Sequence, residues 1–192
     1  ACLVVGSRKD YGRQAMLPHN VPFVLLGAGL LWFGWFGFNA GSALGATASA
    51  ALAWANTFLA PAATLTVWTM LDLWKGGKVT AVGAATAIVV GLVAVPPAAG
   101  HVGPMAALAI GGIAAVPSFF AIHTRTRTRL ADSLDVVAAH GLGGAVGARL
   151  TGVFAATAWG GGADGLLFGN AAQMGPQARS IVAVAAYSGG VS

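Results

Sequence analysis

The chain has 192 residues, of which 57% are hydrophobic and only 8% are charged. A soluble domain carries about 25% charged residues, so this composition excludes an ordinary soluble fold and favours packed membrane helices. The formal net charge of +5 would suggest a nucleic-acid partner in a soluble chain, but membrane topology explains it better here, and the single Cys2 excludes an internal disulfide framework.

Apolar stretches divide the chain into five predicted membrane spans, with an incomplete span at each end. Residues 1–6 look like the tail of an apolar helix, and Ile181–Ser192 is shorter than the roughly twenty residues that a span needs. We therefore expect a fragment at both ends. Pro61 predicts a kink in the second span. The predicted spans are Val21–Leu44, Gly45–Leu73, Thr80–Val95, Met105–His123 and Asp135–Ala158.

Basic residues gather in every second loop. The intervening loops contain no Lys or Arg, apart from Arg179 beside the last segment. The positive-inside rule places the basic loops in the cytoplasm, and a missed helix would break the alternation. We interpret these residues as topology anchors, with a specific anion site as the alternative for the last three. The basic loops hold Arg8, Lys9, Arg13, Lys75, Lys78, Arg125, Arg127 and Arg129.

An aromatic run ends the first span, at the predicted extracellular side. Its five aromatic residues fall in seven positions and cover every side of a helix, and Asn39 and Ser42 follow directly. An aromatic belt at the membrane interface is one interpretation. A site that holds a small cation by cation–π attraction is the other, and the residues alone leave both open. The five are Trp32, Phe33, Trp35, Phe36 and Phe38.

The fifth span begins with polar residues and contains a histidine. Asp132 and Ser133 are helix N-cap types, and Asp135 suits the positive end of the helix dipole. His140 would then lie roughly 12 Å along the axis, well inside the bilayer. A titratable group at that depth by default faces a cavity or pathway, although a packed histidine bonded to a backbone carbonyl remains the alternative. Gly143 and Gly147 form a G-x-x-x-G pattern, which predicts close helix packing.

The remaining polar residues indicate no enzyme. His19, His101 and His123 lie at predicted loop edges, where interfacial roles are expected. A pair of facing histidines for haem is not evident, nor is a catalytic triad, a phosphate loop or a zinc site. We therefore expect no catalytic residue, no metal and no cofactor.

Four linked motifs resemble those of the Amt/MEP ammonium transporters, within the Amt/Rh superfamily. They occur in the family's order, and the similarity covers essentially the whole chain. The departures are Arg149, where the family is usually apolar and where a buried guanidinium would need a partner, and His101, which replaces a common aromatic. The motifs are Gly34–Ser42, Pro97–Gly100 with Gly103 and Pro104, Asp132–Asp135 with His140 to Gly144, and Asp164–Asn170.

The resemblance implies an all-α, polytopic membrane bundle of which this chain forms the second inverted repeat. Residues 1–192 would be a partial ammonium transporter domain, with five full transmembrane helices and a partial one at each end. It would run from the end of the fifth helix into the eleventh. By the same analogy Phe38 gates the pore, Ser42 helps to hold ammonium outside it, Trp35 lines the pore region, and His140 is the second of two pore histidines. We place Asn39, Asp132 and Asp135 in structural or vestibule roles.

The resemblance also implies the partners and location of the complete protein. These are ammonium and ammonia, membrane lipid, a homotrimeric assembly and the plasma or inner membrane, with no nucleic acid. The loop Ser7–Asn20 is similar to a region that PII-type signalling proteins contact from the cytoplasm. The expected function is transport of ammonium or ammonia through a hydrophobic pore. The alternatives are an ammonium-sensor membrane module and an inactive truncated remnant.

Overall fold

The structure is a computed structural model that describes residues 6, 11, 18–125, 132 and 134–191. Regular structure within these residues is entirely helical, which confirms the predicted all-α class. Three single-turn 3₁₀ helices, η2 (Thr157–Trp159), η3 (Leu166–Phe168) and η4 (Ala171–Gln173), connect the last two long helices. The longer elements are α2 (Val21–Gly41), α3 (Ala48–Gly76), α4 (Ala81–Ala94), α5 (Pro104–Arg125), the π-helix η1 (Val137–Leu142), α6 (Gly143–Phe154) and α7 (Met174–Val191).

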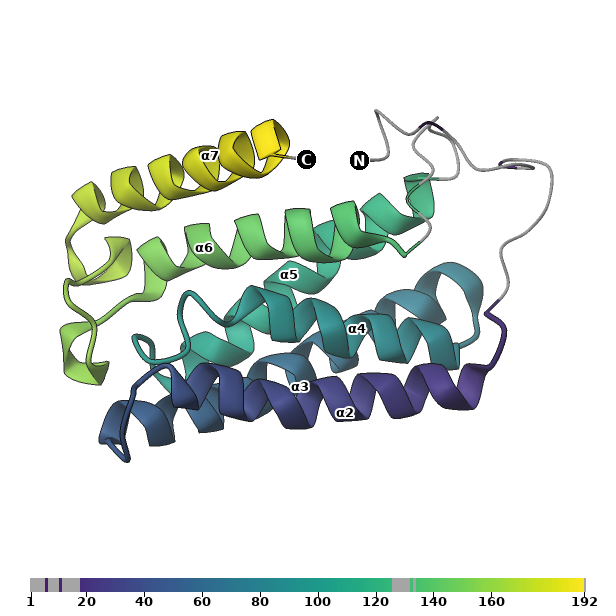
Figure 1. The fold of residues 1–192 in the computed structure, drawn as a ribbon, viewed down its shortest axis with the longest axis horizontal. Coiled ribbons are helices and arrows are strands. Elements are labelled where there is room, and N and C mark those ends of the chain that lie inside the picture. The colour runs from purple at the N-terminus through teal and green to yellow at the C-terminus, as the bar shows by residue number, and fades with distance from the viewer. Residues whose placement is uncertain (1–5, 7–10, 12–17, 126–131, 133, 192) are drawn as a thin grey trace.

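The helices form a bundle in which consecutive helices run in opposite directions (Figure 1). Helix α3 packs against α5, α4 and α2, while α4 also contacts α2, η1 and α6. Helix α7 lies along α6 at one side of the bundle. Helices α3 and α5 end, and α4 and η1 begin, at one end of the bundle, whereas α2, α4 and α6 end at the other. The basic residues in the last turns of α3 and α5, Lys75 and Arg125, therefore share one end. The predicted anchors that lie outside the described residues are Arg8, Lys9, Arg13, Arg127 and Arg129.

The predicted spans match the helices, with shifts of a few residues at their ends. Among the described residues α2, α3 and α5 are long and apolar enough to cross a membrane, whereas α4 has 14 residues. Helix α3 continues through Pro61. The largest correction concerns the last segment, because α7 begins at Met174 and has 18 residues, well before the apolar run that starts at Ile181. Gln177 and Arg179 are therefore helical, although the sequence placed them before the span.

Short polar residues set the beginnings of three helices. The side chain of Asn20 accepts a hydrogen bond from Phe23 N, and Thr47 and Thr80 cap α3 and α4 in the same way. Each cap satisfies one of the N–H groups that a helix leaves free at its start. Helix α3 ends at Gly77, whose φ of 67° is left-handed and suits glycine. These local signals fix the loop positions between apolar stretches.

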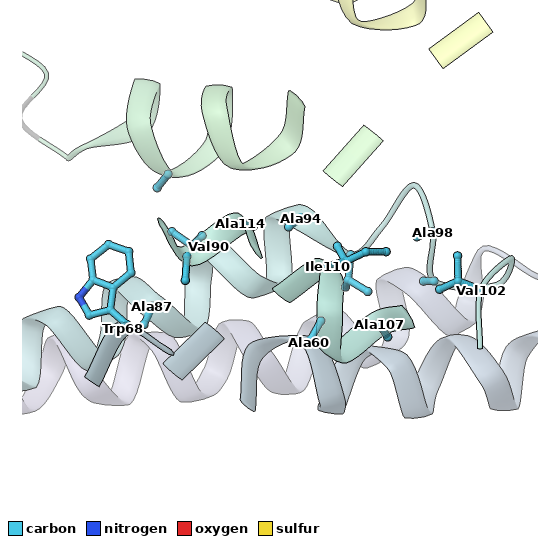
Figure 2. Packing of buried hydrophobic residues seen from close by; sticks show 14 of the residues in the cluster. Ala60, Trp68, Ala87, Val90, Ala94, Ala98, Val102, Ala107, Ile110 and Ala114 are labelled. Carbon is cyan, nitrogen blue, oxygen red and sulfur yellow. The ribbon is translucent and has the colours of Figure 1, made fainter. Parts of the chain in front are cut away.

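Small residues bring the helices close together in the core (Figure 2). A Cβ added to Gly147 of α6 would lie 2.0 Å from the carbonyl oxygen of Ala94 in α4, and one on Gly111 of α5 would lie 2.1 Å from that of Ala60 in α3. Only glycine permits backbones to approach so closely. Gly143, the other glycine of the predicted pair, has ordinary contacts of 3.6 Å and more. The predicted close packing is thus confirmed for Gly147, whereas Gly143 is buried between neighbouring helices at a distance that would also accommodate alanine.

Candidate functional site

The C-terminal end of α2 presents an exposed aromatic ring. Phe38 is 63% exposed, and its ring meets that of Trp35 edge-on at 6.0 Å between centroids. The indole nitrogen of Trp35 is buried and has no hydrogen-bond partner among the described residues. Ser42 caps the helix, and its hydroxyl donates to the carbonyl of Phe38 at 2.7 Å. The structure therefore brings together three of the predicted pore residues on one helix end.

The other residues of the aromatic run attach α2 to α3. Trp32 stacks on Phe58 at 5.7 Å, and Phe36 stacks on Trp54 at 4.8 Å. Phe33, by contrast, is 78% exposed. The run thus has two parts, since one set of rings packs between helices while Trp35 and Phe38 form a separate pair at the helix end.

Asn39 lies inside the bundle, next to Phe38 in sequence. Its side-chain amide donates to the hydroxyl of Thr57 in α3 at 2.9 Å, and the residue is buried. A group engaged in this way supports the helix end more directly than it contacts a ligand.

His140 lies in the π-helix η1 and is exposed at the surface of the described structure. It lines a cavity of about 510 Å³ between η1 and α6 on one side and α7 on the other. The polar side chains of Gln177, Ser180 and Ser188 line the same cavity from α7. Single π-helical turns occur often at functional sites, because they change the direction in which a side chain points. The imidazole can donate or accept a hydrogen bond in a setting of mostly small apolar groups.

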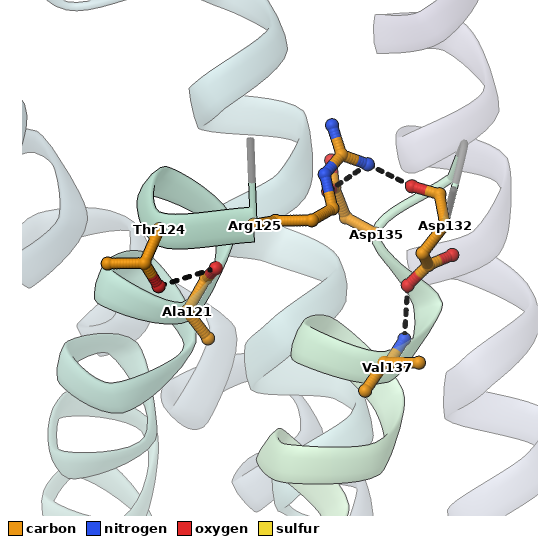
Figure 3. A network of polar contacts seen from close by, with 6 residues as sticks. All are labelled: Ala121, Thr124, Arg125, Asp132, Asp135 and Val137. Atoms are coloured by element: carbon orange, nitrogen blue, oxygen red, sulfur yellow. Dashed lines mark hydrogen bonds and ion pairs between the residues drawn. The ribbon is translucent and has the colours of Figure 1, made fainter. Parts of the chain in front are cut away.

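A charged network precedes η1 (Figure 3). The guanidinium of Arg125 pairs with the Asp135 carboxylate at 2.5 Å and also donates to the carbonyl of Asp132. The Asp132 carboxylate accepts from Val137 N at 2.7 Å. The cap position of η1 is Val136, without a side-chain cap, so the prediction of Asp132 as the N-cap is wrong, and Ser133 lies outside the described residues. Asp132 and Asp135 therefore hold the start of the helix that carries His140.

The two parts of the site lie on opposite sides of α4. Helix α2 carries Phe38 and packs against α3 and α4, whereas η1 carries His140 and packs against α4, α5 and α6. Phe38 is not among the residues that line the cavity of His140. The arrangement supplies two separate elements along one bundle rather than one closed site.

The remaining predicted residues occupy structural or surface positions. Nδ1 of His123 lies 2.8 Å from the carbonyl of Phe119, and Nδ1 of His101 lies 3.3 Å from that of Gly160. Arg149 is exposed on α6 in this structure. Within the described part of the chain no group of His, Cys, Asp and Glu could hold a metal.

Sequence reasoning missed two groups of residues. Gln177, Ser180 and Ser188 were not singled out because polar residues in or beside a short apolar run carry no motif. Their spacing along a helix would have put them on related faces. Thr57 was missed because a threonine within an apolar span carries no motif. Pro61 was the available signal, because a proline inside a helix frees the carbonyl four residues earlier.

Comparisons with known proteins agree on one family. The model of the Ammonium Transporter Family matches residues 1–192. An ammonium transporter of Aquifex aeolicus is 47% identical over 187 residues, which cover 97% of this chain and 43% of that protein. One from Mycobacterium tuberculosis is 41% identical over 194 residues, covering 97% and 41%.

Solved structures give the same result. The crystal structure of Saccharomyces cerevisiae Mep2 aligns with a TM-score of 0.91 at 34% identity, covering 99% of this chain and 45% of that one. A structure described as a sensor Amt protein aligns with a TM-score of 0.87 at 30% identity, covering 99% and 48%. The chain therefore spans less than half the length of the relatives that it matches.

Proposed function

Because the chain belongs to the ammonium transporter family, and is thus a membrane protein of a transporter rather than an enzyme family, we propose that it serves in ammonium transport. The proposal is that it does so as one part of a complete, multi-pass transporter in the plasma or inner membrane. Residues 1–192 would form the second inverted repeat. The observation that carries the proposal is His140, a titratable side chain that lines a cavity within a bundle of membrane helices.

The proposed path begins at the aromatic end of α2. A ring face such as that of Phe38 attracts a small cation, and Trp35 lies beside it. Ammonium would be held there, with Ser42 near the helix end, and would then lose its proton. An ammonium ion pays a heavy desolvation cost in an apolar path, whereas neutral ammonia pays much less. His140 would offer ammonia a hydrogen-bond partner where hydrocarbon offers none.

The proposed activity needs a second set of helices. In transporters built of inverted repeats the substrate site forms between the repeats, near the membrane midplane. The exposed positions of Phe38 and His140 suit such an arrangement, because each side chain has an open side in this structure. We further propose a homotrimeric assembly and contact with a PII-type protein through Ser7–Asn20, most of which lies outside the described residues.

The test is growth on low ammonium of a host that lacks its own transporters. The chain is expressed alone, and then together with the first half of the Aquifex aeolicus relative, a combination that we call the completed transporter. We expect growth and methylammonium uptake only from the completed transporter. His140→Ala should change uptake sharply while the protein remains in the membrane, and the exposed His19→Ala should not. Growth restored by the chain alone, or uptake unaffected by His140→Ala, would contradict the proposal.

A sensor is the second candidate, because the chain also resembles the sensor Amt protein. The same experiment separates the two. A completed protein that binds ammonium without carrying it across the membrane would favour the sensor. Measured uptake with the expected dependence on His140 would favour the transporter.

A further inference from the structure

Helix α2 is held to the bundle by few buried residues. Only Ala28 and Asn39 of its 21 residues are buried. The stacking of Trp32 on Phe58 and of Phe36 on Trp54, together with specific polar contacts, therefore attaches α2 to α3. Two of these contacts end on one residue, Thr57, which is fully buried.

The first contact uses a carbonyl group that Pro61 leaves free. In an α-helix the carbonyl of Thr57 would accept a hydrogen bond from the N–H of residue 61, but proline has no N–H. Trp32 of α2 supplies the missing donor, because its indole nitrogen lies 3.0 Å from the carbonyl oxygen of Thr57. A defect in the hydrogen bonding of α3 thus becomes an attachment point for α2.

The second contact uses the side chain of the same residue. The hydroxyl of Thr57 donates to the carbonyl of Ala53 at 2.6 Å and accepts from the amide of Asn39 at 2.9 Å. Because the hydroxyl proton is directed to Ala53, the oxygen lone pairs are free for Asn39. Removing the hydroxyl would leave a buried amide without this partner.

The two contacts together fix how α2 lies on α3. Trp32 and Asn39 are seven residues apart, which is about two helical turns and places them on one face. One contact alone would permit sliding or rotation, whereas two anchors on that face set both the rotation and the axial position of α2. Phe38 precedes Asn39 directly and touches Trp35, so its ring follows any rotation of the helix end.

We propose that Thr57 and Pro61 form a positioning unit that orients the Phe38 ring at the mouth of the transport path, an inference that rests on the proposed function. Neither residue touches the substrate. The unit acts through Trp32 and Asn39, and its effect is on substrate capture at the mouth rather than on passage along the path.

The first experiment compares threonine variants in the completed transporter. Thr57→Val keeps the shape of the side chain and removes the hydroxyl. We expect a rise in KM for methylammonium on the order of threefold to tenfold, because the loss of one hydrogen bond changes an equilibrium constant by about that factor. The value of kcat should remain nearly unchanged. Thr57→Ser should restore the original KM. The control is Thr66→Val, since the exposed Thr66 hydroxyl bonds only to Ala62 of its own helix.

The second experiment tests the role of Pro61 by a double-mutant cycle. Trp32→Phe keeps a ring but leaves the Thr57 carbonyl without its donor, so KM should rise in the original background. In the Pro61→Ala background a backbone N–H can satisfy that carbonyl, and the effect of Trp32→Phe should fall below about twofold. The thermal midpoint in detergent, measured on the same four proteins, should show the same coupling.

The outcomes distinguish this inference from the proposed function. Uptake by the unsubstituted completed transporter with an unchanged KM for Thr57→Val would overturn the positioning role and leave transport intact. Equal effects of Trp32→Phe in both backgrounds would overturn the role of Pro61. If the completed transporter shows no uptake, the proposed function fails, while the coupling in thermal midpoint still decides whether Thr57 and Pro61 hold α2.

Discussion

Gly147 is the position where adding one methyl group should have the clearest effect on stability. A Cβ at this site would lie 2.0 Å from the carbonyl oxygen of Ala94 and 2.7 Å from its carbon. Both atoms belong to the backbone of α4, which cannot rotate away as a side chain can. Gly147→Ala therefore requires α6 and α4 to separate.

The magnitude follows from two opposing terms. Alanine stabilises a helix interior by about 1 kcal/mol relative to glycine. Overpacking of a filled interior costs about 1–3 kcal/mol and occasionally more. The overlap with rigid backbone places Gly147→Ala at or beyond the upper end of that range. We expect a net destabilisation of roughly 2 kcal/mol.

Gly143→Ala is the matched control on the same helix. A Cβ there would have ordinary contacts, 3.6 Å to the Ser118 hydroxyl and 3.7 Å to Val90. Its helix-propensity gain should therefore remain, and the thermal midpoint should stay the same or rise. The assay is thermal unfolding of the completed transporter in detergent. A midpoint for Gly147→Ala at or above that of Gly143→Ala would refute the close-approach argument.

Two further predictions concern topology and Arg149. In a background without Cys2, a cysteine at Gly77 should resist a membrane-impermeant thiol reagent in intact cells, whereas a cysteine at Gly162 should react with it. The two loops lie at opposite ends of the bundle, and the basic one is expected in the cytoplasm. The reverse labelling pattern would overturn the predicted orientation. Arg149→Ile should raise the thermal midpoint of the completed transporter, because a guanidinium at the centre of a membrane helix costs on the order of 2.5–3.5 kcal/mol. A clear fall would instead identify a paired, structural role for Arg149 in the completed protein.

Much of the helix arrangement was accessible from the sequence. Apolar length predicted α2, α3, α4 and α5 to within a few residues, because a long run of apolar side chains in a membrane has helix as its only satisfied backbone form. Asn20, Thr47 and Thr80 marked three helix starts through contacts within one turn. Such features depend only on neighbouring residues, so the sequence contains them directly.

The start of α7 shows where local reasoning failed. The segment before Ile181 contains Gln177, Arg179 and Ser180, and the apolar run was placed only from Ile181 onward. In the structure this segment is helical, and Gln177 and Ser180 line the cavity of His140. A polar segment can still be helical when its polar side chains face a cavity or another polar surface. The sequence alone does not show whether such a surface lies next to the segment.

Contacts between helices were decided by the tertiary structure alone. The same G-x-x-x-G pattern gave an approach that only glycine permits at Gly147 and one that alanine would also fit at Gly143, because the rotation of α6 determines how near each glycine lies to the backbone of α4. Pro61 predicts from the sequence that the carbonyl of Thr57 lacks its helical donor. Only the packing of α2 on α3 brings Trp32 to that carbonyl. Residue types and apolar lengths thus determined which helices form. The rotation and axial position of each helix, which set the partners of Thr57 and the open side of His140, depend on contacts between residues far apart in the chain.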